Sequence, residues 1–228
     1  MELFRAIAGR DDIEISRRLV SSPDLATRPI GLGASRRDAN AYFLDSIRHH
    51  VYQGDTALHI AAATHQPALA ESLVTSGANA RARNRRGAEP LHYAADGSAA
   101  AQQWERDAQR DVIAYLVDVG ADPNALDSSG VAPLHRAVRN RCTAAVSALI
   151  DNGANPRLMN WSGSTPLHLA VQNTGKSNSG SSAAHDEQGR IIVVLLAHGA
   201  SPNDVDAKGK TVAAAATSAW VRDLLGAD

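Results

Sequence analysis

The chain has 228 residues, a formal net charge of −1 and a pI of about 6.8, which excludes a uniformly basic nucleic-acid binder and an acidic tail protein. Its single cysteine, Cys142, excludes an intramolecular disulfide and a multi-cysteine metal site. We find neither a signal peptide nor an apolar run long enough for a membrane span, and we expect a cytoplasmic protein.

The first predicted element is a pair of helices over residues 1–26, in which apolar residues recur at helical spacing between polar ones. Residues 27–52 follow as an insertion. Within it, the run from Ser35 to Asp38 has the form of a capping box, which predicts a short helix over residues 39–47.

Four copies of one pattern follow, and each contains a Leu-His pair with alanine two residues later. Their leading glycines, and that of a worn fifth copy, are 33, 43, 33 and 46 residues apart. The underlying period is therefore 33, with insertions in the second and fourth copies. The leading glycines are Gly54, Gly87, Gly130, Gly163 and Gly209.

The Pro-Leu-His-x-Ala motif at this period resembles the ankyrin repeat family. The resemblance implies an all-α, ankyrin-type solenoid of stacked helix-turn-helix repeats with β-turn or hairpin fingers. The 43 alanines and only 4% aromatic residues agree with thin, closely packed helix layers. Twenty arginines against three lysines indicate a GC-rich genome, from which we expect a bacterial source.

We predict a single ankyrin repeat domain over residues 1–228. Its parts are an N-terminal cap (1–26), the insertion (27–52), a repeat (53–86), a repeat with an insertion (87–129), a repeat (130–162), a repeat with an insertion (163–208) and a C-terminal cap (209–228). Within the inserted residues 96–110, the stretch from Ala99 to Gln109 has a helix-forming composition. Within the inserted residues 173–190, the run from Asn173 to Ser182 has the composition of a flexible loop.

Residues that could suggest catalysis or metal binding have simpler explanations. Four histidines recur one repeat apart, too far for a shared zinc ion, and the resemblance implies that they bridge turn backbone groups. The run Ala170–Ser177 fits a relaxed phosphate-loop pattern but follows a helix, not a strand. Cys142 has no persuasive histidine partner. We therefore expect no catalytic residue, metal or cofactor. The four histidines are His59, His92, His135 and His168.

The turn at residues 81–86 carries four arginines where the resembled family favours asparagine and aspartate. Three interpretations of this turn are open: a solvated loop, a binding site for an acidic protein and a binding site for nucleic acid. Of the two binding sites, the one for an acidic protein is favoured. Trp161 contacts a partner or packs on a neighbouring turn. Trp104 is either a second residue that anchors a binding partner or a residue that covers the helix of its own insertion.

In the resembled family, the turn tips and the first-helix face contact partners. The function we expect is therefore non-catalytic protein–protein interaction. The alternatives are a regulatory subunit or inhibitor that occludes an enzyme's active site, and an enzyme that uses the Lys176 loop. The candidate partner-binding residues are Tyr52, Gln53, Arg83, Arg85, Arg86, Asp96, Arg139, Asn140, Trp161 and Gln172.

Overall fold

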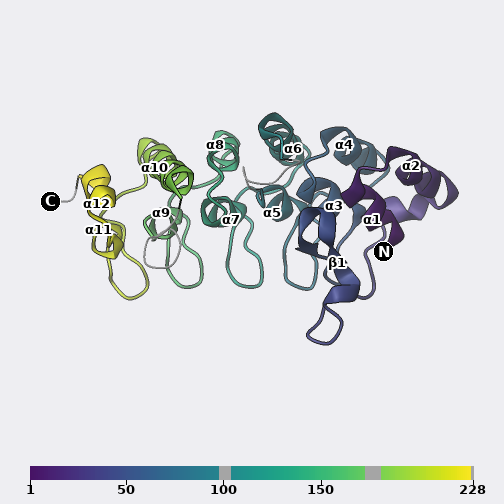
Figure 1. Ribbon diagram of the computed structural model, residues 1–228, viewed down its shortest axis with the longest axis horizontal. Helices are drawn as coiled ribbons and strands as arrows, with labels where there is room; N and C mark the ends of the chain where they lie inside the picture. The colour runs from purple at the N-terminus through teal and green to yellow at the C-terminus, as the bar shows by residue number, and fades with distance from the viewer. Residues whose placement is uncertain (98–103, 173–180, 227–228) are drawn as a thin grey trace. The chain divides into compact units, whose positions relative to one another are not determined.

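The computed structural model describes residues 1–97, 104–172 and 181–226 (Figure 1). The chain divides into two compact units. Unit 1 comprises Met1–Ala94 and Gln103–Asp122, and unit 2 comprises Ala95–Gln102 and Pro123–Asp228. Each unit is a run of antiparallel helix pairs, so the all-α ankyrin solenoid implied by the sequence is confirmed.

Unit 1 contains three helix pairs, in which the first helices pack side by side and the second helices cover them. Short 3-10 turns and a two-stranded sheet lie between the first and second pairs. The helix pairs are α1 (Glu2–Gly9) with α2 (Asp12–Ser21), α3 (Ala57–Ala63) with α4 (Pro67–Thr75), and α5 (Pro90–Ala94) with α6 (Arg106–Asp118).

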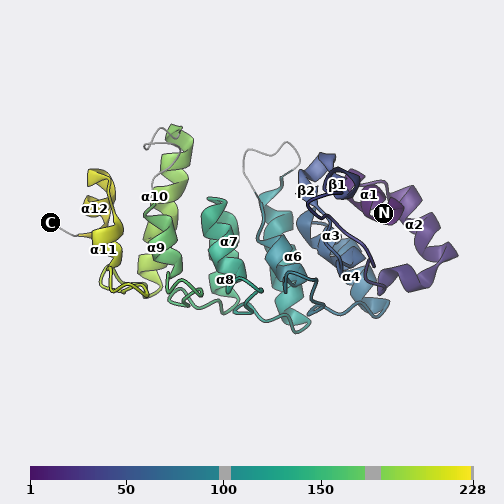
Figure 2. The same cartoon turned by 90° about the horizontal axis from the view of Figure 1, so that it is seen from below.

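Unit 2 repeats this arrangement, with α7, α9 and α11 in one row and α8, α10 and α12 in the other (Figure 1). Helix α10 has 16 residues against nine in α8 and extends well beyond it (Figure 2). The helix pairs are α7 (Pro133–Arg139) with α8 (Thr143–Asp151), α9 (Pro166–Ala170) with α10 (Ser182–Ala197), and α11 (Val212–Ala215) with α12 (Ala219–Leu225).

Local chemistry explains where the helices begin and end. Pro90, Pro133 and Pro166 each stand at the first helical position, where the missing N–H costs no hydrogen bond. The second helices from α4 onward are followed by glycines at positive φ, such as Gly153 at +89°, a backbone conformation that favours glycine.

The repeated histidines have the structural role that the resemblance implies. His168 Nδ1 accepts a hydrogen bond from the backbone N–H of Thr165 at 3.2 Å, and its Nε2 lies 3.2 Å from the carbonyl oxygen of Lys210. His59 makes the equivalent contacts with Thr56 N and Ala88 O. Each ring therefore ties the start of a first helix to the next turn.

We call the extended turn that leads into each first helix a finger. The second finger is 79–89, the third 123–132, the fourth 155–165 and the fifth 201–211. The first finger is split: Ile30 N donates to Asp55 O at 2.8 Å, and Gly54 N donates to Ile30 O at 2.9 Å. Asn84 makes the same two backbone bonds within the second finger. The inserted segment is thus 31–52, at the tip of the first finger, and residues 27–30 belong to the finger itself.

The short helix expected over 39–47 is wrong. That stretch forms two 3-10 turns and the β1 strand, which pairs antiparallel with β2 so that Phe43 lies opposite His50. Ser35 Oγ does accept a hydrogen bond from Asp38 N, but no α-helix follows over 39–47. The elements are η2 (Asn40–Tyr42), β1 (Phe43–Leu44), η3 (Asp45–Ile47) and β2 (His49–His50).

The other two insertions mainly lengthen helices. Helix α6 begins at Arg106, within the stretch of helix-forming composition, while 98–103 lies outside the described residues. In the fourth repeat, α10 begins at Ser182, at the end of the run 173–182 for which a flexible loop is expected, and Ser181 caps the helix by accepting from Ala184 N. Residues 173–180, which include the Lys176 loop, lie outside the described residues.

Candidate partner-binding surface

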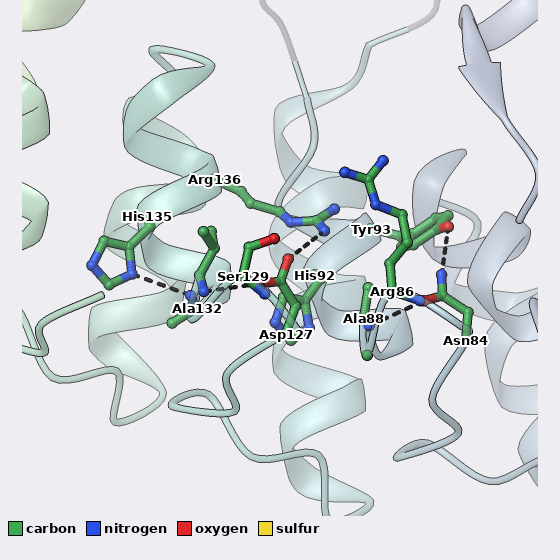
Figure 3. Close-up of polar contacts among 12 residues, drawn as sticks. Asn84, Arg86, Ala88, His92, Tyr93, Asp127, Ser129, Ala132, His135 and Arg136 are labelled. Atoms are coloured by element: carbon green, nitrogen blue, oxygen red, sulfur yellow. Dashed lines mark hydrogen bonds and ion pairs between the residues drawn. The ribbon is translucent and has the colours of Figure 1, made fainter. Parts of the chain in front are cut away.

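Each finger from the second to the fifth is closed by one asparagine or aspartate side chain. Asn84 Oδ1 accepts from the backbone N–H groups of Arg86 and Ala88 at 2.8 and 3.1 Å, and Asp127 does the same for Ser129 and Val131 (Figure 3). The inward-facing acceptor fixes the turn, and the residue that follows it is exposed. These exposed residues are Arg85, Ser128, Trp161 and Ala207.

A buried carboxyl group joins the first two fingers of unit 1. Asp55 is 0% exposed and accepts from Tyr52 N at 2.6 Å, Asn84 Nδ2 at 2.8 Å and the Tyr93 hydroxyl at 2.9 Å. His59 Nε2 lies 3.9 Å from the same carboxyl group. The second finger is therefore held against the first by side-chain bonds as well as by packing.

The arginines of the second finger are exposed, but their side chains contact the rest of unit 1. Arg83 Nε donates to Gly87 O at 3.0 Å. Arg85 donates to Ala34 O in the inserted segment. Arg86 Nη1 donates to the Tyr52 hydroxyl at 2.8 Å, and its Cζ lies 4.8 Å from the centre of the Tyr52 ring. Arg85 and Arg86 are thus exposed to solvent and are also held by contacts with the inserted segment. Gln53, also exposed, accepts Arg85 N through its backbone carbonyl at 2.8 Å.

Glu89 stands where the first and fourth copies of the motif have threonine. It is 3% exposed, its Oε2 has no hydrogen-bond partner among the described residues, and Arg83 Nε lies 4.0 Å from Oε1. Burial raises the pKa of the Glu89 carboxyl, although Arg81 and Arg83 oppose the effect. A buried, incompletely paired carboxyl group at a helix start costs stability.

We expect Glu89→Thr to raise the free energy of unfolding by about 1 kcal/mol at neutral pH, because threonine caps the helix and no buried carboxylate remains. The folded state binds the Glu89 proton more tightly than the unfolded state. The benefit should therefore shrink as the pH falls toward the ordinary glutamate pKa of 4.5. Urea unfolding at several pH values tests this. A Glu89→Ala control separates removal of the charge from gain of the cap, and an unchanged or lower stability of Glu89→Thr would contradict it.

In unit 2, Arg136 bridges two carboxyl groups. Its Nη1 lies 2.9 Å from Asp96 Oδ2 and its Nη2 lies 3.1 Å from Asp127 Oδ2. Asn140 Nδ2 donates to the other Asp96 oxygen at 3.0 Å. Burial raises the pKa of the Asp96 carboxyl, although Arg136 acts to lower it. For Asp127 the balance is reversed: burial acts to raise its pKa, but hydrogen bonds from the N–H groups of Val131 and Ser129, together with Arg136, outweigh burial and lower it.

Of these residues the sequence analysis named Asp96 and Asn140 but missed Arg136. A signal was present, because Arg136 follows the repeated histidine at a position that holds isoleucine, tyrosine and leucine in the other three copies. A charged residue at an otherwise apolar or aromatic position indicates a polar contact specific to that repeat. Arg139 is exposed one helical turn further along.

Trp161 packs on the neighbouring finger and is exposed to solvent at the same time. Its side chain is 69% exposed, yet a Cβ added at Gly130 would overlap the Trp161 indole, so the ring lies directly on the third finger. Gly130 also has φ of +69°. Met159, two residues earlier, is 48% exposed. The fourth finger thus presents an apolar surface whose indole is held in place by its neighbour.

Trp104 covers the helix of its own insertion. Its Nε1 donates to Gln109 Oε1 at 2.7 Å, and the buried Gln109 donates to Ala94 O at 2.9 Å. Gln172 is exposed, and its backbone carbonyl accepts from Arg141 and Gln188. Cys142 is buried.

No group of three or more metal-ligating side chains occurs among residues 1–97, 104–172 and 181–226. In the same ranges, no helix has the length and apolar character that crossing a membrane requires.

The comparisons with known proteins agree with this geometry. A family model described as "Ankyrin repeats (3 copies)" matches residues 98–179, and the single "Ankyrin repeat" model matches residues 53–85 and 162–207. No match was found among the curated proteins. The chain belongs to the ankyrin repeat family, whose members are generally protein–protein interaction modules and typically lack catalytic activity.

Proposed function

We propose that this chain is a non-catalytic module that binds a protein partner through its fingers and first helices. The observation that carries the proposal is Trp161, a large apolar side chain that is 69% exposed and held in place over Gly130. A rigid, exposed tryptophan loses little conformational entropy on binding, and tryptophan is enriched among residues that dominate interface energies.

The partner we propose has an apolar pocket for Trp161 and negative charge opposite the second finger. Arg83, Arg85 and Arg86 support this assignment of charge, and Arg85 and Arg86 have no ion pair among the described residues. The other residues we assign to the contact are Gln53, Asp96, Arg139, Asn140 and Gln172. We also propose that residues 1–228 form a single folded domain. A cytoplasmic location is a further proposal, which the single cysteine supports because disulfides are rare in the reducing cytosol.

We expect Trp161→Ala to weaken partner binding by about tenfold or more, because the indole is the largest exposed apolar group on the fingers. Tagged full-length chain would be used to capture partners from a lysate, and the affinity of the recovered protein would then be measured by calorimetry. Val193→Ala is the matched control, since Val193 is 54% exposed on α10, away from the fingers.

Equal binding by the wild type, Trp161→Ala and Val193→Ala would remove Trp161 from the interface. If the recovered protein is an enzyme whose activity falls on binding, the chain acts as an occluding inhibitor, which is the alternative form of the same recognition.

A further inference from the structure

Two arginines of the second finger are fixed by the segment inserted in the first finger. The guanidinium carbons of Arg85 and Arg86 lie 5.7 and 4.8 Å from the centre of the same Tyr52 ring. Arg86 also donates to the Tyr52 hydroxyl, and Arg85 donates to Ala34 O. The ring and the carbonyl come from segment 31–52, so the insertion positions both cations.

Neither of these two arginines has an ion pair among the described residues, so no neighbouring acid neutralises their charge. In some other exposed arginines a neighbouring acid does pair with the guanidinium, as in Arg17 with Glu14 at 2.7 Å and Arg28 with Asp24 at 3.0 Å. Because a guanidinium carries five N–H donors, the one donor that Arg85 gives to Ala34 and the one that Arg86 gives to Tyr52 leave most of the fork available.

An aromatic ring beside a guanidinium changes what that group can bind. The ring attracts the cation and limits its rotamers without neutralising its charge. An oxyanion that arrives therefore meets donors that are already oriented, and less side-chain entropy is lost than with a freely moving arginine. Carboxylate and phosphate groups both match the planar donor geometry.

We propose that Arg85 and Arg86, held by Tyr52, form a clamp for the carboxylate groups of an extended acidic segment in the protein partner. This inference rests on the function proposed above and adds the chemistry that the second finger recognises. A protein segment is favoured over nucleic acid because members of the ankyrin repeat family are generally protein–protein interaction modules. The net charge of −1 also argues against a general polyanion surface.

The test uses the full chain and a fluorescein-labelled octapeptide of alternating glutamate and serine, with binding followed by fluorescence anisotropy. Arg86→Ala and Tyr52→Ala should each weaken binding by about tenfold, and Tyr52→Phe, which keeps the ring, by about threefold. Arg81→Ala is the matched control, an exposed arginine of the same finger with no Tyr52 contact in the described structure. It should change the affinity by less than about twofold.

Three results would overturn the clamp: no binding of the peptide, equal weakening by Arg81→Ala and Arg86→Ala, or tighter binding of an oligothymidylate than of the peptide. Binding of a phosphoserine version alone would replace carboxylate with phosphate as the ligand. Tyr52→Phe keeps the test meaningful if Tyr52→Ala unfolds, which circular dichroism would reveal. If the clamp fails but Trp161→Ala still abolishes partner capture, the proposed function stands without it.

Discussion

Replacing Asp55 with alanine should lower the free energy of unfolding of unit 1 by about 4 kcal/mol. The Asp55 carboxyl is fully buried and accepts hydrogen bonds from Tyr52 N, Asn84 Nδ2 and the Tyr93 hydroxyl. Alanine leaves three oriented donors in a space that is closed to the bulk solvent. Each unsatisfied buried donor costs about 1–3 kcal/mol, and a water molecule in the vacated volume can recover part of this.

Urea unfolding can isolate this effect if tryptophan fluorescence reports on unit 1 alone. Trp104 lies in unit 1, so Trp161→Phe and Trp220→Phe give a background in which it is the sole tryptophan. Tyr93→Phe removes one donor and should cost about 1 kcal/mol. Asp45→Ala, at an exposed aspartate of the inserted segment, should change stability by less than about 0.5 kcal/mol.

A double-mutant cycle between Asp55→Ala and Tyr93→Phe then measures the direct bond. We expect the Tyr93 change to cost less in the Asp55→Ala background than alone, because the hydroxyl has already lost its acceptor. A loss below about 1 kcal/mol for Asp55→Ala would mean that the carboxyl group does not hold the fingers together.

The helix pairs could be predicted from the sequence because their signals are local. Pro166 at the first helical position, Thr165 before it and the glycine at positive φ after α10 act within a few residues. The 33-residue period then repeats these signals, so a wrong interpretation of one copy is corrected by the others. The bond from Thr165 N to His168 is equally local, because the two residues are three apart, whereas the bridge to Lys210 O spans 42 residues and is implied only by the resemblance to the family.

The inserted segment could not be predicted because distant hydrogen bonds determine its structure. Ser35 and Asp38 form the local capping contact, yet Val51 N donates to Tyr42 O at 2.8 Å and the chain turns into a hairpin instead of a helix. In the fourth repeat, the run 173–182 has a loop-like composition, which does not indicate that Ser181 caps α10. The burial of Gln188 on this helix depends on a bond to Ala170 O and likewise leaves no local signal.

The candidate site shows the same division. An exposed basic turn could be predicted, since four arginines lie within six residues. Its fixed geometry could not, because Tyr52 and Ala34 lie more than 30 residues away from the arginines they hold. A tertiary contact between an arginine and a tyrosine leaves no periodic pattern in one sequence.

Lowering the pH from 7 to 5 should destabilise unit 1 by about 2 kcal/mol through His65 alone. His65 is 5% exposed in the turn between α3 and α4, with φ of +50°, and its Nε2 lies 3.2 Å from Ala94 O. Burial lowers the pKa of His65 from 6.5 to about 4, the Ala94 carbonyl opposes this shift and Arg10 adds to it. The ring is therefore neutral in the folded chain at neutral pH.

The sign follows from proton binding in the two states. Between pH 6.5 and about 4 the unfolded chain binds a proton at His65 and the folded chain does not, so stability is complete above 6.5 and falls as the pH falls. Two and a half pH units correspond to about 3 kcal/mol once the pH is below the folded pKa. His135 in unit 2 also has a pKa lowered by burial, so a variant at residue 65 is needed to separate the two contributions.

His65→Asn is the suitable variant, because asparagine tolerates positive φ and does not titrate. Both proteins are compared in the background with Trp104 as sole tryptophan. Between pH 7 and pH 5, the free energy of unfolding of the protein with His65 should fall by about 2 kcal/mol more than that of the His65→Asn variant. Nuclear magnetic resonance of the folded chain gives the pKa directly, from the shift of the His65 ring proton with pH. Parallel pH dependences in the two proteins, with a His65 pKa near 6.5, would show that the ring is solvated and that acid destabilises unit 1 through other groups.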